Sequence, residues 1–200
     1  MKIHTVYPVG FASNSYIVTA DDETCIVIDC AQPRVLRECQ KLNLTPVVVL
    51  LTHGHYDHIG GCGAFFSAGA KIYCGAGEDE YIFSRENRAI FNLPIPDFKI
   101  EKTLCDGEEI ELCGLKIKVI ATAGHTEGGV CYLIEDSLFT GDTLFNSGVG
   151  RCDLPSGNER KLVASVKKLY ALQGDFTVYS GHGELTTLEN ERKHNPFVRA

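Results

Sequence analysis

The sequence lacks the features that would place a 200-residue chain in a membrane or outside the cell. Its longest apolar run, residues 47–51, is far shorter than the roughly 20 residues that span a bilayer. The amino terminus, MKIHTVYPVGFASNSYIV, has no basic region followed by an apolar block and a small-residue cleavage site. We therefore expect a cytoplasmic protein that does not act on a membrane.

The sequence also lacks paired cysteines and an excess of positive charge. Nine cysteines would fit a disulfide framework in a short secreted protein, but the number is odd and no two form a Cys-x-x-Cys pair. Reduced thiols in a cytosol fit this pattern better. The formal net charge of −7 gives no general basic surface for phosphate backbones, so we expect no nucleic-acid partner. Composition thus favours a small-molecule enzyme or binder.

Short β-rich segments alternate with turns and a few helical stretches along the whole chain. The expected strands are residues 2–7, 13–20, 24–30, 46–51, 107–112, 115–121, 130–134, 138–140 and 176–179. The expected helices are residues 33–43, 60–68, 77–91 and 158–172. No repeat, linker or low-complexity segment interrupts them, so we expect residues 1–200 to form one layered α/β domain with two sheets.

The densest group of ionisable side chains lies in residues 50–61, LLTHGHYDHIGG. The β-branched run before it predicts a strand buried on both faces, so residues 52–57 should emerge on the loop at its end. His53, His55 and His58 offer neutral nitrogens there, and Asp57 adds an anionic oxygen. This set of donors is typical of a metal site, whereas a solvated polar loop is the alternative.

Three further polar residues each follow an apolar strand beside a glycine. They are His125 in IATAGHTEGG, Asp142 in LFTGDTLF and His182 in VYSGHGE. Seven ligands are too many for one tetrahedral ion, but they suit two ions that share a carboxylate, with water or hydroxide completing each shell. We expect two divalent ions, zinc first, although iron and manganese tolerate the same donors.

The order T-H-G-H-Y-D-H, G-H-T, G-D-T and G-H-G resembles the metallo-β-lactamase fold superfamily over nearly the entire chain. The stretches FTGDTLF, GVGRCDLPSG and ERKHNPF are similar to its glyoxalase II (hydroxyacylglutathione hydrolase) branch and the short bacterial relatives of that branch. The resemblance implies a four-layer αββα sandwich with metals at one edge. It assigns His53, His55 and His125 to one metal, Asp57, His58 and His182 to the other, and Asp142 to a bridge between them.

The resemblance implies a metal-dependent hydrolase that cleaves S-lactoylglutathione or a related small acyl thioester. Two neighbouring divalent ions lower the pKa of a shared water, so that a metal-bridging hydroxide exists at neutral pH. Asp57 would orient this hydroxide in addition to its ligand role. The thiol of a thioester has a pKa near ~8.5, so it leaves as a thiolate without a strong general acid.

Other members of the superfamily share parts of this pattern. The lactamases proper lack an aspartate at the position of Asp142, so antibiotic hydrolysis is not expected. The persulfide dioxygenase branch carries a G-R-x-D-x-x-x-G stretch similar to residues 150–157 and resembles a single-iron oxygenase using His53, His125 and Asp142. All seven ligands occur in both branches, so this alternative stays open. A non-catalytic metal-binding protein would typically have lost ligands, and none is lost here.

The chain departs from typical glyoxalase II enzymes in three places. Those enzymes carry a helical carboxy-terminal domain that supplies basic residues for glutathione, whereas only eighteen residues follow His182 here. Arg151 occupies the position of their glutathione-contacting lysine, and a surface role is its alternative. Asp29 resembles the family aspartate that supports the metal ligands, although the Pro-Gly that usually follows is Cys30-Ala31. An ordinary strand-end turn residue is the alternative for Asp29.

Overall fold

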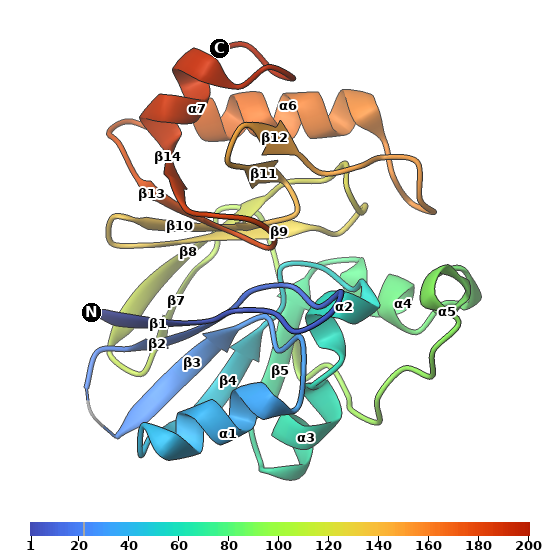
Figure 1. Ribbon diagram of the computed structural model, residues 1–200, viewed down its shortest axis with the longest axis vertical. Coiled ribbons are helices and arrows are strands. Elements are labelled where there is room, and N and C mark those ends of the chain that lie inside the picture. Colours follow the sequence, from blue (N-terminus) through green and yellow to red (C-terminus); the bar gives the residue numbers. More distant parts are fainter. Residues whose placement is uncertain (22) are drawn as a thin grey trace.

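The computed structural model describes residues 1–21 and 23–200. Two six-stranded sheets pack face to face, and helices cover their outer faces (Figure 1). The protein is therefore the α/β, four-layer αββα sandwich that the sequence motifs imply, and the expected division into two sheets is confirmed.

The first sheet has the order β1-β2-β3-β4-β5-β6. Its strands are β1 (Lys2–Val6), β2 (Ser15–Thr19), β3 (Thr24–Ile28), β4 (Thr45–Leu50), β5 (Lys71–Gly75) and β6 (Lys102–Leu104). The strands from β3 to β6 run parallel, so the carboxyl ends of β3, β4 and β5 meet at one edge. The helices α1 (Arg34–Lys41) and α3 (Cys62–Ser67) lie against the outer face of this sheet (Figure 1).

The second sheet has the order β14-β13-β10-β9-β8-β7. Its strands are β7 (Glu109–Leu112), β8 (Leu115–Ala121), β9 (Val130–Ile134), β10 (Ser137–Gly141), β13 (Thr177–Ser180) and β14 (Thr186–Thr187). The helices α6 (Glu159–Tyr170) and α7 (Leu188–His194) cover its outer face (Figure 1). The remaining elements are α2 (Tyr56–Ile59), α4 (Glu78–Ile82), α5 (Arg85–Phe91) and the small hairpin of β11 (Leu144–Phe145) and β12 (Gly148–Val149).

Three apolar cores separate the four layers. Alternate residues of the central strands face opposite sides, so Val27 and Val49 contact the core under α1 and α3. Their neighbours Ile28 and Leu50 fill the core between the two sheets. Val166 of α6 belongs to a third core beneath the second sheet. This packing fixes the strand ends from which the polar loops emerge.

Several boundaries differ from the sequence prediction. The expected helix over residues 77–91 is two helices, because Ser84 interrupts it and its hydroxyl accepts the N–H of Asn87 to cap α5. The expected helix over residues 60–68 is present as the shorter α3, and the separate helix α2 precedes it and begins in the segment that was expected to be a loop. The run over residues 47–51 is not buried throughout, because Val47 is 37% exposed.

The strands β5 and β6 and the helix α7 have no counterpart among the predicted elements. β5 is a five-residue segment and β6 a three-residue segment, and both gain their hydrogen bonds only beside β4 and each other. Sequence periodicity is weak over such short segments, so pairing with neighbours decides their conformation.

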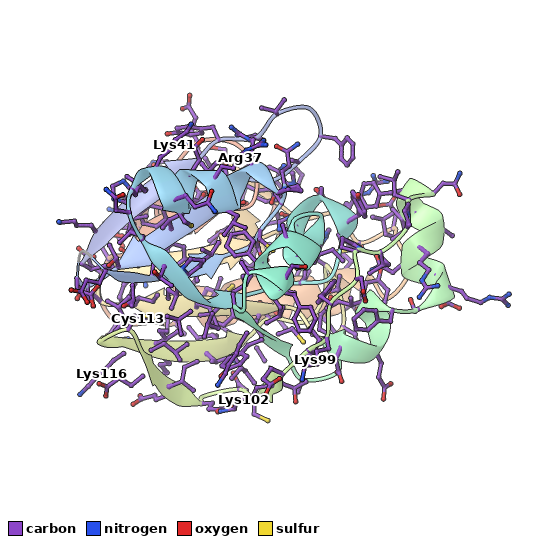
Figure 2. The ribbon with its side chains drawn as sticks, turned by 90° about the horizontal axis from the view of Figure 1, so that it is seen from below. Arg37, Lys41, Lys99, Lys102, Cys113 and Lys116 are labelled. Atoms are coloured by element: carbon purple, nitrogen blue, oxygen red, sulfur yellow. The ribbon has the colours of Figure 1, made fainter. Side chains whose placement is uncertain are left out.

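The outer surface carries exposed cations on separate elements. Figure 2 shows Arg37 and Lys41 on α1 and Lys116 on the strand β8 of the other sheet. Within residues 1–21 and 23–200, no helix has the length and apolar character needed to cross a membrane.

Candidate metal centre

The structure brings together all seven side chains that the sequence nominates as ligands, at one edge of the sandwich. They are His53, His55, Asp57, His58, His125, Asp142 and His182. Loops at the carboxyl ends of four strands hold them: Asp142 follows β10 directly and His182 lies two residues beyond β13. Asp57 and His58 lie in the short helix α2. Packing of the two sheets therefore joins residues separated by 129 positions in the chain.

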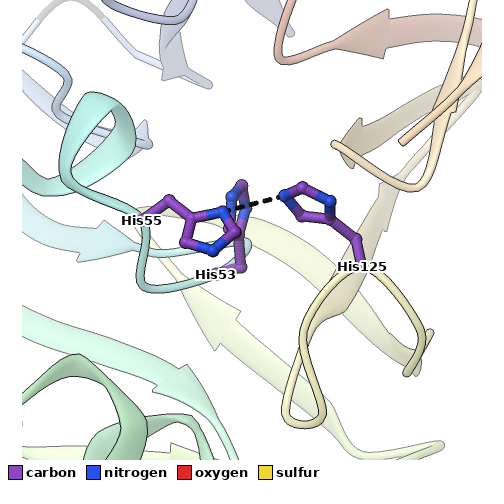
Figure 3. Close-up of side chains that lie close together, drawn as sticks. All are labelled: His53, His55 and His125. Atoms are coloured by element: carbon purple, nitrogen blue, oxygen red, sulfur yellow. Dashed lines mark hydrogen bonds between the residues drawn. The ribbon is translucent and has the colours of Figure 1, made fainter. Parts of the chain in front are cut away.

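His53, His55 and His125 form the first group of possible ligands. One nitrogen from each ring lies within 4.8 Å of the others. Figure 3 shows the three rings close together, with His55 Nδ1 and His125 Nε2 only 2.9 Å apart. All three residues are buried, with 2% of His53 and His55 and 5% of His125 exposed.

The other hydrogen-bond partners of His55 and His125 indicate which ring nitrogen carries the proton in each neutral imidazole. His125 Nδ1 lies 2.8 Å from the carbonyl oxygen of Arg151, so this nitrogen donates and Nε2 keeps a lone pair. Tyr81 donates its hydroxyl proton to the carbonyl of Pro155, and His55 Nε2 therefore donates to the Tyr81 oxygen at 3.1 Å. Two unprotonated nitrogens then face each other across 2.9 Å. A cation between them satisfies both lone pairs, as in a metal site.

His53 is arranged in the same way. Its Nδ1 lies 3.1 Å from the Thr52 hydroxyl, which donates its own proton to Asp29 at 2.7 Å. His53 Nδ1 must therefore donate, and its buried Nε2 has no hydrogen-bond partner in the structure. An unpaired lone pair in a buried polar cluster is the state expected of a metal ligand.

The electrostatic environment favours the neutral form of His53 and His55. Burial and the neighbouring His58 hold the pKa of His53 well below its usual value. Burial, and then the neighbouring His125, lower the pKa of His55 to about 3. Neutral imidazoles are the form that binds metal ions.

Asp57, His58 and His182 form the second group, and their ligand atoms also lie within 4.8 Å of one another. His182 Nε2 lies 3.1 Å from Asp57 Oδ2. His58 Nδ1 donates to Asp29 Oδ2 at 2.7 Å, which leaves Nε2 directed at the other carboxylates. The side chain of His182 is 38% exposed, so this group is more accessible than the first.

Asp142 lies between the two groups. Its Oδ1 is 3.2 Å from His58 Nε2, and its Oδ2 is 3.5 Å from His125 Nε2 and 3.6 Å from His182 Nε2. Burial opposes ionisation, but the nearby imidazoles, His58 first, hold the pKa of Asp142 far below its usual range. The residue is thus an ionised carboxylate whose Oδ2 lies near one histidine of each group, as expected for a bridging ligand.

Asp29 is a buried carboxylate that hydrogen-bonds to residues of the ligand loops. It is 2% exposed and has a left-handed backbone conformation, with φ of 54°. Its carboxylate accepts the N–H and the hydroxyl of Thr52, at 2.8 and 2.7 Å, and the Nδ1–H of His58. It touches ligands without facing the metal positions, as the resemblance implies.

Arg151 contacts the site through its backbone. Its carbonyl accepts from His125, while its guanidinium makes two 2.7 Å hydrogen bonds with the carboxylate of Asp153. The Arg151 side chain is 61% exposed. In this conformation the guanidinium is occupied by Asp153 rather than directed at the ligands.

Aromatic rings line the side of the site next to His55. The Phe91 ring lies 6.5 Å from His55, and Phe11 stacks on Phe91 at 5.8 Å. Tyr56 lies 6.1 Å from Phe91. Phe11 is 60% exposed, so these rings present an apolar surface beside the ligands.

Sequence reasoning missed two buried residues that hold the ligand loops. Glu78 accepts the N–H of Gly54, and the Asn87 side chain donates to the carbonyl of the same glycine at 2.7 Å. Glu78 is the first of three acidic residues, followed by Asp79 and Glu80 at the start of α4, where acidic side chains are common. Nothing in the sequence distinguishes Glu78 from its two neighbours.

The pattern that describes the metallo-beta-lactamase superfamily matches residues 8–182. The chain therefore belongs to the metallo-beta-lactamase superfamily, whose members bind divalent metals. Hydroxyacylglutathione hydrolase GloC of Haemophilus influenzae is 30% identical over 213 residues, which cover 100% of this chain and 99% of GloC.

Solved structures agree with this assignment. BLEG-1, described as a B3 metallo-beta-lactamase, has a TM-score of 0.92 and 30% identity, with both chains covered completely. TTHA1623, solved in a di-iron-bound form, has a TM-score of 0.82 and 31% identity, covering 99% of this chain and 100% of its own. ETHE1 from Myxococcus xanthus has a TM-score of 0.81 and 26% identity, and the match covers 98% of this chain and 84% of the ETHE1 chain.

Proposed function

We propose that this protein is a thioester hydrolase of the glyoxalase II type, acting on S-lactoylglutathione or a related small acyl thioester. The observation that carries the proposal is the position of Asp142 between two separate groups of ligands. The similarity to GloC over the full length of both chains supports the choice of substrate class.

The donor atoms fit two divalent ions. His53, His55 and His125 would hold one ion and Asp57, His58 and His182 the other, with Asp142 shared. Buried atoms without hydrogen-bond partners occur in both groups and in the shared carboxylate: His53 Nε2, His58 Nε2 and Asp142 Oδ1. Mixed nitrogen and oxygen donors suit zinc, iron or manganese, and zinc is our first choice.

The protein residues have distinct parts in the proposed reaction. With two ions held by these seven side chains, the site would supply hydroxide at neutral pH and would polarise the thioester carbonyl. Asp57, whose Oδ2 contacts His182, orients the attacking oxygen by accepting its proton at Oδ1. The apolar surface of Phe11 and Phe91 excludes water from one side of the site. The thiol product needs no strong acid, because its pKa of about 8.5 lets it leave as thiolate.

The direct test is hydrolysis of S-lactoylglutathione by protein reconstituted with zinc, and separately with iron. We expect turnover that is lost in Asp142→Ala. Absence of turnover with either metal contradicts the substrate proposal. Because BLEG-1 is described as a lactamase, the chromogenic cephalosporin nitrocefin is assayed in parallel. Efficient cleavage of nitrocefin without thioester cleavage would favour a lactamase.

An iron-dependent persulfide dioxygenase is the second candidate. Two histidines and one carboxylate, here His53, His125 and Asp142, form the set typical of mononuclear iron oxygenases. The similarity to ETHE1 fits both candidates, and the di-iron form of TTHA1623 shows that this fold accepts iron. Oxygen uptake with glutathione persulfide, in protein holding one iron, would support this candidate over the hydrolase.

A further inference from the structure

Glu78 is a fully buried carboxylate outside the ligand set. Its exposed fraction is 0%, yet no basic side chain forms an ion pair with it among the described residues. Burial of a carboxylate without a positive partner is costly unless hydrogen bonds replace the lost water. The hydrogen-bond donors around Glu78 must therefore replace that water.

All three partners of Glu78 come from the two loops that carry the first ligand group. Its Oε1 accepts the N–H of Gly54 at 2.7 Å. Its Oε2 accepts the hydroxyl of Thr126 and the N–H of Gly128, both at 3.0 Å. Gly54 lies between His53 and His55 in the sequence, and Thr126 directly follows His125.

The backbone is shaped for this close approach. A Cβ atom on Gly128 would lie 2.8 Å from Glu78 Oε2 and 2.4 Å from the backbone nitrogen of Glu78. A Cβ atom on Gly54 would lie 2.4 Å from Ile82 in the same helix as Glu78. Neither glycine can therefore carry a side chain without moving α4 away from the ligand loops. Asn87 holds the opposite side of Gly54 by donating to its carbonyl.

We propose that Glu78 is a positioning residue that ties the two histidine loops together and thereby sets the metal affinity of the His53, His55 and His125 group. The inference rests on the metal centre of the proposed function, but it concerns metal affinity rather than the substrate. Each oxygen of the carboxylate serves a different loop, so only an acceptor at both positions maintains the spacing of the histidines. Residues that orient metal ligands typically contribute 10–100-fold to affinity.

Glu78→Gln separates this role from packing. Glutamine has nearly the same volume, but it replaces one acceptor oxygen with an NH₂ group that faces an N–H donor. Titration of metal-free protein with Zn²⁺ at pH 8, against a chromogenic chelator, should show about 10–100-fold weaker binding of one zinc ion. The matched control is Glu80→Gln, at an exposed position of the same helix, which should bind both ions like the wild type.

A second pair of variants tests the same contact from the other side. Thr126→Val removes one donor to Glu78 and Thr126→Ser keeps it. We expect Thr126→Val to bind zinc more weakly than the wild type and Thr126→Ser to bind it as tightly as the wild type. A folded Glu78→Gln protein with unchanged zinc affinity overturns the inference. Should Glu78→Gln not fold, equal affinities of Thr126→Val and Thr126→Ser overturn it instead.

The zinc-affinity test of Glu78 and the thioesterase test of the proposed function can fail independently of each other. Zinc affinity is read without any substrate, so a protein that loses affinity in Glu78→Gln but cleaves no thioester contradicts only the proposed function. A protein that cleaves the thioester but binds zinc equally well in both forms contradicts only the role of Glu78.

Discussion

The two halves of the metal centre are built differently. The half formed by His53, His55 and His125 contains only imidazoles, and burial holds the pKa of His53 and His55 below the usual value. The other half includes a carboxylate. There, carboxylates led by Asp142 and Asp57, respectively, raise the pKa of His58 and His182 in spite of burial.

This difference gives the two candidate metal positions unlike surroundings, although similar residues form both. The first half consists of three buried imidazoles, so we expect its metal affinity to depend on how accurately the loops place three lone pairs. The second half contains the carboxylate of Asp57 and is partly exposed, so we expect charge attraction to contribute more to its metal affinity. Two buried carboxylates support the halves: Glu78 holds the loops of the first half, whereas Asp29 contacts His58 of the second half directly and His53 of the first half through Thr52.

The largest effect is expected from the residue that the halves share. Asp142→Ala removes the carboxylate proposed to be shared by both metal positions and leaves His58 Nε2 without its nearest carboxylate oxygen. We expect loss of at least one of the two metal ions and a fall in thioesterase activity of more than about 100-fold, since even supporting contacts contribute that much. Metal content by mass spectrometry and initial rates check this. Full metal content with near-normal activity would exclude a bridging role.

The next largest effect is expected from a substitution that weakens metal binding in one half more than in the other. Asp29→Asn keeps the shape of the side chain but weakens the charge that orients His58. We expect about 10–100-fold weaker binding of the ion in the second half, while binding in the first half changes less. Stepwise zinc titration, compared with Glu78→Gln, measures both affinities. If the two variants weaken the same binding step, the halves are not supported independently.

The grouping of the seven candidate ligands was predictable from sequence, because five of them lie beside a glycine near the end of a strand and Asp57 and His58 follow in the same H-x-H-x-D-H motif. His125 and His182 follow apolar segments closely enough that the strand assignment alone places them at the edge of a sheet. The two-sheet fold followed from the same segments. The pairing of β5 and β6 depends on neighbouring strands, which local sequence does not encode.

The supporting residues were not equally predictable. Asp29 ends a predicted strand and matches a family motif, whereas Glu78 is one of three adjacent acidic residues. Glu78 is buried and Glu80 is exposed only because α4 packs with one face on the ligand loops. That orientation follows from tertiary contacts with Gly54 and Gly128, which lie 24 and 50 positions away.

The pH dependence of stability tests the cost of burying Glu78. Burial raises its pKa from 4.5 to about 7 although its hydrogen bonds oppose the shift. The folded state therefore binds the proton more tightly than the unfolded chain. This contribution is fully present below pH 4.5 and is lost as the pH rises through about 7.

The stability advantage of the wild type over Glu78→Gln should thus shrink between pH 5 and pH 8, by an amount on the order of 3 kcal/mol at most. Urea unfolding of the metal-free proteins at several pH values measures the difference. Glu80→Gln, which changes an exposed carboxylate, should show no comparable trend. An advantage that grows with pH would mean that the hydrogen bonds outweigh burial.

The smallest effect is expected at the apolar side of the first half. Phe11 is 60% exposed and contacts the rings of Phe91 and Tyr56 rather than a candidate ligand, so we expect it to contribute to substrate binding without positioning a ligand. Loss of one aromatic contact by Phe11→Ala should raise KM about three- to tenfold with little change in kcat. Phe145→Ala gives the matched change beside His182 in the second half, where the rings lie 6.2 Å apart. A larger KM effect from Phe145 than from Phe11 would place the apolar part of the thioester on the carboxylate side, and unchanged KM in both would show that neither ring contacts it.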